Sequence, residues 1–261
     1  MPSTYAHYRF GTGLLPNMPA DIRRTIQRFR QLFDMGLHGP DIFYFSVPPF
    51  QSGIRFLSVK FHEQSGREFF KRVCRAVRME RSEAALAYLC GVLCHYCLDA
   101  MCHPMVDEWA KEANLSQMEI EAEFERFLLA KDGSFPPNGQ ELTRHMQLTP
   151  GECDTVAKFY VGANARNVRD CVNNMARITK LITTPEGTRR TLVAKGISIL
   201  DKDLTDFLIP TQPSPRCAHL DEPLLALYQQ AQEIFPRLLT QLLSHIAHNA
   251  LLGEDFSPIF G

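Results

Sequence analysis

Two histidines and an aspartate recur at every fourth position of the segment HYCLDAMCH, which contains His95, Asp99 and His103. A helix turns by about 100° per residue, so each step of four residues drifts by only about 40°. The three side chains are therefore predicted to form one stripe along a helix. Imidazole and carboxylate groups are good ligands for zinc and similar divalent ions, and a stripe of this length could serve two metals with the aspartate between them.

The same segment admits two other interpretations. One is a histidine pair hydrogen-bonded to an aspartate in an ordinary core. We favour the metal interpretation, because burying these groups without a metal is costly. The other is a thiol site. Cys102 lies on the stripe and is a candidate thiolate ligand, whereas Cys94 and Cys97 point elsewhere, give no clear chelating pair and are interpreted as small core residues.

One helix cannot saturate a metal, so further ligands must come from other segments. The acidic and imidazole side chains that we consider are His7, His38, Asp41, His62, Asp107, Glu108, Glu121, Glu123 and His145. His219, His245 and His248 lie far downstream. The last two are three residues apart on a predicted helix, where a solvated or capping role is the favoured interpretation.

Helical periodicity dominates the elements that must position these residues. Ser65, Ser82 and Ser116 are predicted N-caps, and Glu119 follows Ser116 at the capping-box spacing. Helices are predicted at residues 19–36, 65–79, 81–105, 115–130, 149–182, 183–197 and 221–253, and long loops at 38–64, 130–147 and 206–223. No run alternates apolar and polar residues for long enough to build a sheet, so we predict an all-α multi-helix bundle with long loops.

Length and composition exclude several classes of protein. For 261 residues we expect one domain over residues 1–261, with a boundary near residue 148 as the alternative. The formal net charge of -1 offers no basic field for nucleic acid, and eight cysteines are too sparse for a disulfide scaffold. We find no secretory signal and no apolar run of the roughly 18 to 20 residues that span a bilayer. The expectation is a soluble, cytoplasmic protein with reduced thiols.

Four motifs occur in order over the first 104 residues: AHYRFG, GPDIFYF, KFHEQSG and HYCLDAMCHP. Together they resemble the zinc-dependent phospholipase C family, and within it the N-terminal domain of glycosylphosphatidylinositol-specific phospholipase D. The resemblance implies an all-α fold and a cluster of two or three zinc ions. Relatives of this family include zinc-dependent nucleases of single-stranded nucleic acid with the same metal cluster.

The resemblance also implies a set of metal ligands. Asp41, His62, His95 and Asp99 would hold one zinc ion. Asp99 would bridge to a second ion, which His7 would also hold.

A third zinc ion would be held by His103 and Glu121. In the family a histidine four residues before the glutamate completes this site, and here that position is Gln117. The departure puts the third site in question. Glu123 and His145 are the substitutes that we consider.

The predicted activity is that of a metal-dependent phosphodiester hydrolase, phospholipase C-like, in which Asp41 accepts the proton of a zinc-activated water. The alternatives are a nuclease or phosphomonoesterase with the same cluster, and a non-catalytic descendant that keeps its metals for stability. The expected partner is a phosphoester substrate, with phospholipid at a membrane surface as one option and no nucleic acid as a stable partner. The aromatic segment that follows Asp41, IFYFSVPPF, is interpreted as packing around the site, with an apolar wall for a lipid or nucleobase as the alternative.

Overall fold

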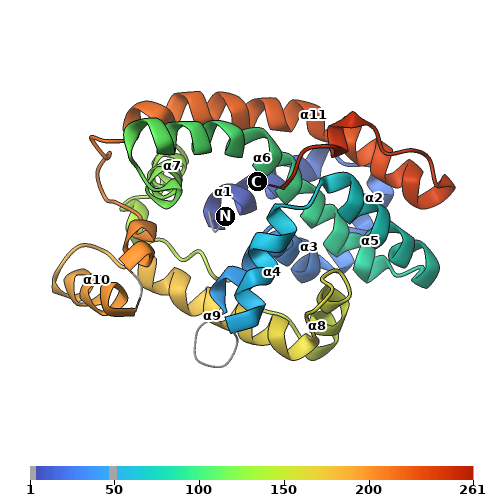
Figure 1. Cartoon of the computed structure of the whole chain (residues 1–261), viewed down its shortest axis with the longest axis horizontal. Helices are drawn as coiled ribbons and strands as arrows, with labels where there is room; N and C mark the ends of the chain where they lie inside the picture. Colours follow the sequence, from blue (N-terminus) through green and yellow to red (C-terminus); the bar gives the residue numbers. More distant parts are fainter. Residues whose placement is uncertain (1–3, 47–51, 201, 261) are drawn as a thin grey trace.

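The computed structural model describes residues 4–46, 52–200 and 202–260. Every regular element in these residues is a helix, apart from one isolated bridge between Ser65 and Ile259, and the prediction of an all-α bundle is confirmed (Figure 1). The α-helices are α1 (Thr4–Leu14), α2 (Ala20–Arg28), α3 (Arg30–Gly36), α4 (Ser52–His62), α5 (Gly66–Glu80), α6 (Glu83–Ala113), α7 (Gln117–Lys131), α8 (Pro150–Ala157), α9 (Ala165–Ile182), α10 (Thr188–Leu200) and α11 (Asp221–His248). Short 3-10 helices connect several of them, including η2 (Gly39–Phe45).

Helix α6 is the central element of the bundle. The Ser82 hydroxyl caps its N-terminus by accepting a hydrogen bond from the Ala85 amide, and the helix continues through Pro104. Every residue from 87 to 99 is buried, because α1, α3 and α11 pack against α6. A helix that is apolar on nearly all sides belongs in the interior of a protein, and one apolar core cluster surrounds this one.

By length and composition alone, α6 could cross a membrane. Its most apolar 18-residue window has a mean hydropathy of 1.5, which makes it a weak candidate for a membrane span. However, 78% of that window is buried inside the protein, as in the core helix of a globular fold. The cytoplasmic location stays a prediction.

Helices α3 and α6 cross at a contact between two glycines. A Cβ on Gly36 would lie 2.3 Å from the carbonyl oxygen of Tyr88, and a Cβ on Gly91 would lie 2.2 Å from that of Phe33. Only glycine permits two backbones to approach this closely. The crossing therefore holds the C-terminal end of α3 against the part of α6 that precedes His95.

The predicted N-caps are all present. The Ser65 hydroxyl accepts a hydrogen bond from the Glu68 amide, and the Ser116 hydroxyl accepts one from the Glu119 amide. Helix α8 begins with a reciprocal capping box between Thr149 and Glu152. These local signals could be found in the sequence because each depends on residues only three positions apart.

Several predicted helices have different bounds in the structure. The helix predicted at 81–105 continues to Ala113, and the one predicted at 221–253 ends at His248. The helix predicted at 19–36 is broken at Phe29, whose φ of -120° is not helical. The helix predicted at 149–182 is two helices, because Gly162 adopts a φ of +104° and Asn164 caps a new helix by accepting a hydrogen bond from the Asn167 amide. The helix predicted at 183–197 begins later, at Thr188.

Two helices were missed. The predicted loop at 38–64 contains η2 and α4, and α1 was not predicted at all. Helix α4 has the sequence SGIRFLSVKFH, in which aromatic and β-branched residues lower the helix propensity. Helix α1 contains two glycines, and Gly11 is needed there because a Cβ would lie 2.1 Å from the Leu37 side chain. Tertiary packing therefore decides both elements.

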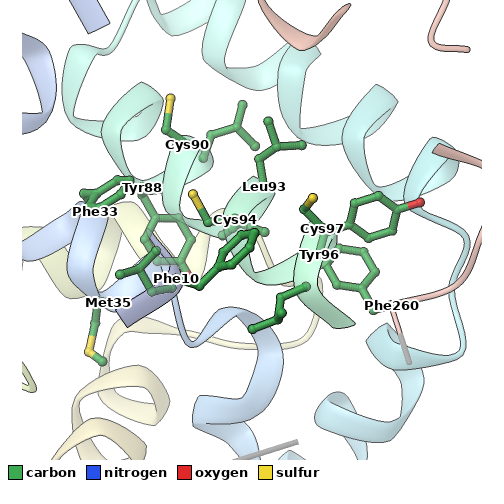
Figure 2. Packing of buried hydrophobic residues seen from close by; sticks show 14 of the residues in the cluster. Phe10, Phe33, Met35, Tyr88, Cys90, Leu93, Cys94, Tyr96, Cys97 and Phe260 are labelled. Atoms are coloured by element: carbon green, nitrogen blue, oxygen red, sulfur yellow. The ribbon is translucent and has the colours of Figure 1, made fainter. Parts of the chain in front are cut away.

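The thiols of α6 belong to the core. Figure 2 shows the sulfur atoms of Cys90, Cys94 and Cys97 among apolar side chains, and none of the eight cysteines, which all lie in the described residues, forms a disulfide. The interpretation of Cys94 and Cys97 as core residues is confirmed, since both are buried. Tyr96 packs edge-on against Phe260 with ring centroids 4.9 Å apart, so the C-terminal segment closes this end of the core.

Replacing Gly91 by alanine tests the crossing of α3 and α6. The new methyl group would clash with the Phe33 carbonyl, and we expect Gly91→Ala to lower the free energy of unfolding by about 1 to 3 kcal/mol. Gly151→Ala is the control, because a Cβ at this exposed position of α8 meets no described atom within 4 Å. Chemical denaturation of both variants measures the difference. Equal stability of the two would contradict the tight crossing.

Candidate metal centre

The structure brings the predicted ligands together in one buried region, although they come from five separate elements. The residues are His7 on α1, Asp41 on η2, His62 at the end of α4, His95, Asp99 and His103 on α6, and Glu121 on α7. The side chain of Glu121 is 13% exposed, and the other six residues are buried.

The carboxylate of Asp99 lies at the middle of this cluster. Its Oδ1 atom is 3.1 Å from Nε2 of His7 and 3.5 Å from Nε2 of His103. Its Oδ2 atom is 3.1 Å from Nε2 of His95 and 3.7 Å from Nε2 of His62. The predicted stripe on α6 therefore exists, and two further histidines from α1 and α4 meet it.

Two groups of three side chains have their ligand atoms within 4.8 Å of one another. The first group is His7, His95 and Asp99, and the second is Asp41, His62 and His95. In the second group, Oδ1 of Asp41 lies 3.1 Å from Nε2 of His62. Two groups that share His95, the first of which includes Asp99, match a pair of adjacent metal positions.

The protonation states of the central pair suit metal binding. Burial raises the pKa of Asp99, but His95 and other nearby groups outweigh this effect and lower that pKa to well below its usual value. Burial lowers the pKa of the His95 imidazole to about 4. At neutral pH the carboxylate is thus ionised and the imidazole is neutral, and these are the forms that bind a metal.

Unpaired polar atoms indicate that the cluster lacks a partner. The buried atoms without a hydrogen bond to any described residue include both ring nitrogens of His95, Nδ1 of His7 and of His103, and Oε2 of Glu121. Nε2 of His95 faces Oδ2 of Asp99 at a distance of 3.1 Å. A buried polar atom left unpaired costs about 1 to 3 kcal/mol. Imidazole and carboxylate groups that converge in one buried site form a donor set that fits divalent zinc.

A backbone carbonyl orients His62. Nδ1 of His62 donates a hydrogen bond of 2.7 Å to the carbonyl oxygen of Ser58, one turn earlier in α4. Nε2 is left to face Asp41. A carbonyl that holds the second ring nitrogen is the usual outer-shell partner of a metal-binding histidine. The sequence analysis did not identify Ser58, although it lies four residues before the predicted ligand.

Glu121 and His103 form the outer part of the cluster. Oε1 of Glu121 lies 4.0 Å from Nε2 of His103, and burial is the main reason why the pKa of Glu121 is raised to about 8. The side-chain amide of Gln117 donates a hydrogen bond to Oδ1 of Asp107. Because the Gln117 amide makes this hydrogen bond, it does not replace the histidine that the family resemblance implies at this position.

A pocket opens beside the outer part of the cluster. It is a small cavity of about 40 Å³, lined by His7, Leu98, Asp99, Cys102, His103, Val106, Glu121, Phe124 and Leu224, together with Ala6. One side of the pocket is thus formed by ligand-type side chains, and the other is apolar.

His38 and His145 form a separate pair. Their Nε2 atoms are 2.8 Å apart, and the ring of His145 also stacks on Tyr8 with centroids 4.1 Å apart. Neither histidine belongs to the groups of three described above. The pair joins the loop before α8 to the start of η2, so His145 is not placed as a substitute for the missing third-site histidine.

The other candidates from the sequence also have different surroundings. Glu123 accepts a hydrogen bond from Arg126 in a buried ionic network with Asp221, so it is not placed as a substitute ligand. His245 contacts the carbonyl oxygen of Ala250 through Nδ1, which fits the predicted capping role. The exposed candidates are Glu108, His219 and His248.

Gly39 is a further residue that the site requires and that sequence analysis did not single out. Its φ is +47°, a conformation that favours glycine, and a Cβ there would lie 2.5 Å from Cδ2 of His95. The motif GPD contains the signal, because the glycine comes two residues before Asp41. Gly39 thus lets the turn that carries Asp41 lie directly against the His95 ring.

We expect Gly39→Ala to weaken zinc binding. The added methyl group must displace the His95 ring, and the loss should be roughly 10- to 100-fold, as when an outer-shell partner of a metal ligand is removed. Competition with a chromophoric chelator measures the affinity. Gly133→Ala is the matched control, since Gly133 has a φ of +77° but a Cβ there meets no described atom within 4 Å. Equal affinities for the two variants would contradict the steric role of Gly39.

Comparison with known protein families agrees with this geometry. The family model described as zinc dependent phospholipase C matches residues 6–171, which is more than half of the chain and includes all seven predicted ligands. Neither a curated protein nor a solved structure gives a significant match.

Proposed function

The chain belongs to the zinc-dependent phospholipase C family, and we propose that it hydrolyses phosphodiesters in the manner of a phospholipase C. The observation that carries the proposal is the position of Asp99, whose two oxygens face different histidines of a buried cluster. A carboxylate in this position can join two metal positions. Adjacent metals are a common arrangement for cleaving phosphate esters.

The proposed roles of the residues follow from their positions. Asp41, His62, His95 and Asp99 would hold one zinc ion, and His7 would hold a second together with Asp99. When bound, zinc offsets the charge of the phosphate oxygens and makes water a stronger acid, with a pKa of about 7.

Asp41 is the proposed proton acceptor. It is buried at the start of η2, and burial raises its pKa, but its hydrogen bond with His62 is among the effects that lower that pKa to well below the usual range. Asp41 is therefore ionised and can accept the proton of the attacking water. A serine or cysteine nucleophile is not needed for this reaction.

The proposed substrate is a phospholipid at a membrane surface. The apolar wall of the pocket, formed by Leu98, Val106, Phe124 and Leu224, supports a substrate with an apolar portion next to its phosphate. The aromatic segment after Asp41 does not add to this wall, because Ile42, Phe43 and Phe45 are buried in the core; residues 47–50 lie outside the described residues.

A panel of substrates tests the choice between this proposal and its alternatives. We expect diacyl phospholipids to be cleaved faster than single-stranded nucleic acid or p-nitrophenyl phosphate esters. Preferential cleavage of nucleic acid or of a phosphomonoester would replace the phospholipase proposal by one of the other hydrolases. No turnover of any substrate by the zinc-loaded protein would favour the non-catalytic descendant, for which Gln117 at the third site already argues.

We expect Asp41→Asn to lower the rate of hydrolysis by roughly 10²- to 10⁴-fold, the usual effect of losing a general base. The amide has the same shape but cannot accept the proton, so the fold should be spared. Metal content measured on the same sample separates loss of the base from loss of a ligand. Asp154→Asn is the control, because Asp154 is exposed on α8, away from the cluster. An unchanged rate in Asp41→Asn would rule out Asp41 in both roles.

Metal content is the second test. Elemental analysis of the purified chain should find two or three equivalents of zinc. Removing the zinc with a chelator should abolish hydrolysis and lower the melting temperature, because a ligand that binds only the native state stabilises it. Readdition of zinc should restore both properties. A carefully handled protein without zinc would remove the basis of the proposed function.

A further inference from the structure

We propose that Glu125 is a positioning residue for the metal centre, because its buried carboxylate holds the first turn of α1 where His7 can meet Asp99. The proposal rests on the proposed function, since it concerns the zinc position that His7 and Asp99 would share. Glu125 is not itself a candidate ligand, because it belongs to neither of the two groups of three found among the described residues. It would act on the metal through His7.

The carboxylate of Glu125 accepts hydrogen bonds from the backbone of α1. Its Oε1 atom accepts one from the Tyr5 amide and another, of 3.3 Å, from the Ala6 amide. Glu125 reaches α1 from helix α7 and is only 3% exposed. The first N–H groups of an α-helix have no partner inside the helix, so a buried helix end needs an acceptor from elsewhere. Glu125 supplies this acceptor directly before His7.

Helix α1 depends on such contacts because its sequence holds it only weakly in place. It has 11 residues, two of which are glycines, and isolated helices of this length are marginal in water. A negative charge near a helix N-terminus is favourable, and hydrogen bonds from backbone amides to a carboxylate are stronger than those between neutral groups. The contact with Glu125 therefore stabilises the end of α1 that carries His7.

A second carboxylate holds α1 on the other side of His7. Oδ2 of Asp132, at the end of α7, accepts hydrogen bonds of 2.6 Å from the Tyr5 hydroxyl and from Nε of Arg9. The side chains of Arg9 and Asp132 are 27% and 30% exposed, whereas Glu125 is buried. Solvent weakens the exposed ion pair, so the buried contact is the stronger of the two.

Helix α7 connects the contact with α1 to the metal centre. Glu125 follows Glu121 by one helical turn, so both side chains lie on the same stripe of α7. Nε2 of His7 lies 3.1 Å from Oδ1 of Asp99. A shift of α1 by one residue along its axis would move the imidazole by about 1.5 Å, and an error of about 1 Å already impairs a metal or catalytic site. His7 therefore needs a fixed α1 to keep its place.

The zinc affinity of the full-length chain tests the proposal. Methionine is close to glutamate in length but offers no strong acceptor, so Glu125→Met leaves the two amides unpaired. We expect it to weaken the zinc position of His7 by roughly 10- to 100-fold, as when an outer-shell partner of a metal ligand is lost. Glu125→Gln keeps an acceptor oxygen and should bind zinc nearly as tightly as the natural protein. Competition with a chromophoric chelator measures the affinities, and elemental analysis gives the equivalents bound.

A double-mutant cycle separates positioning from general stability. His7→Ala should itself weaken this zinc position, and adding Glu125→Met should cause no further loss of zinc affinity, because Glu125 acts through His7. The matched control is Glu152→Met, which removes a carboxylate that accepts the Thr149 amide at the start of α8. The control should lower the melting temperature but leave the zinc affinity unchanged.

Three results would overturn the proposal. They are zinc binding by Glu125→Met as tight as in the natural protein, an equal loss with and without His7, and equal losses in Glu125→Gln and Glu125→Met. If Glu125→Met does not fold, Glu125→Asp takes its place, since its shorter carboxylate cannot reach both amides, and the same results decide. A natural protein that binds no zinc would remove the proposed function together with this proposal. Zinc binding that does not respond to changes at Glu125 would remove this proposal alone.

Discussion

The structure depends on a buried carboxylate with four imidazole nitrogens around it. The nearest side-chain nitrogens of His7, His62, His95 and His103 lie between 3.1 and 3.7 Å from Asp99. An ionised carboxylate in a protein interior costs several kcal/mol unless charged or polar partners compensate for it. The histidines reach Asp99 from α1, α4 and α6, so these three helices must meet at one place. In this protein the position of a buried charge therefore constrains the bundle in addition to the apolar core.

Different sides of helix α6 carry side chains with different chemical roles. One side carries the histidines and Asp99, and another presents Cys90, Cys94 and Cys97 to apolar neighbours (Figure 2). The thiols add little polarity, so they fill the space of small apolar side chains without competing for the metal. Burial raises the pKa of Cys94, which keeps its sulfur protonated and inert. Because they lie on different sides of one helix, ligand side chains and oxidisable thiols can lie within a few residues of each other along the chain.

Some residues of this site can be predicted from the sequence alone and others cannot, for physical reasons. His95, Asp99 and His103 follow from spacing alone, since a helix brings every fourth residue to one face. Asp41 and His62 were identified by resemblance, because nothing local shows that η2 and α4 fold back on α6. Helices α1 and α4 have weak intrinsic propensity and form through packing. Contacts between distant loops, such as His38 with His145, leave no periodic pattern to find.

The crossing of α3 and α6 has a consequence for the precision of the centre. Gly36 lies three residues before Gly39, and Gly91 lies one helical turn before His95. The two backbones are in contact at Gly36 and Gly91. Only short segments separate these contacts from Gly39 and from His95, so these residues can move little relative to one another. The short segments determine how far the turn with Asp41 stands from the imidazole of His95. Side chains can adjust by rotation about their bonds, but peptide groups in direct contact cannot. The backbone geometry therefore limits how much the spacing of the proposed metal ligands can vary.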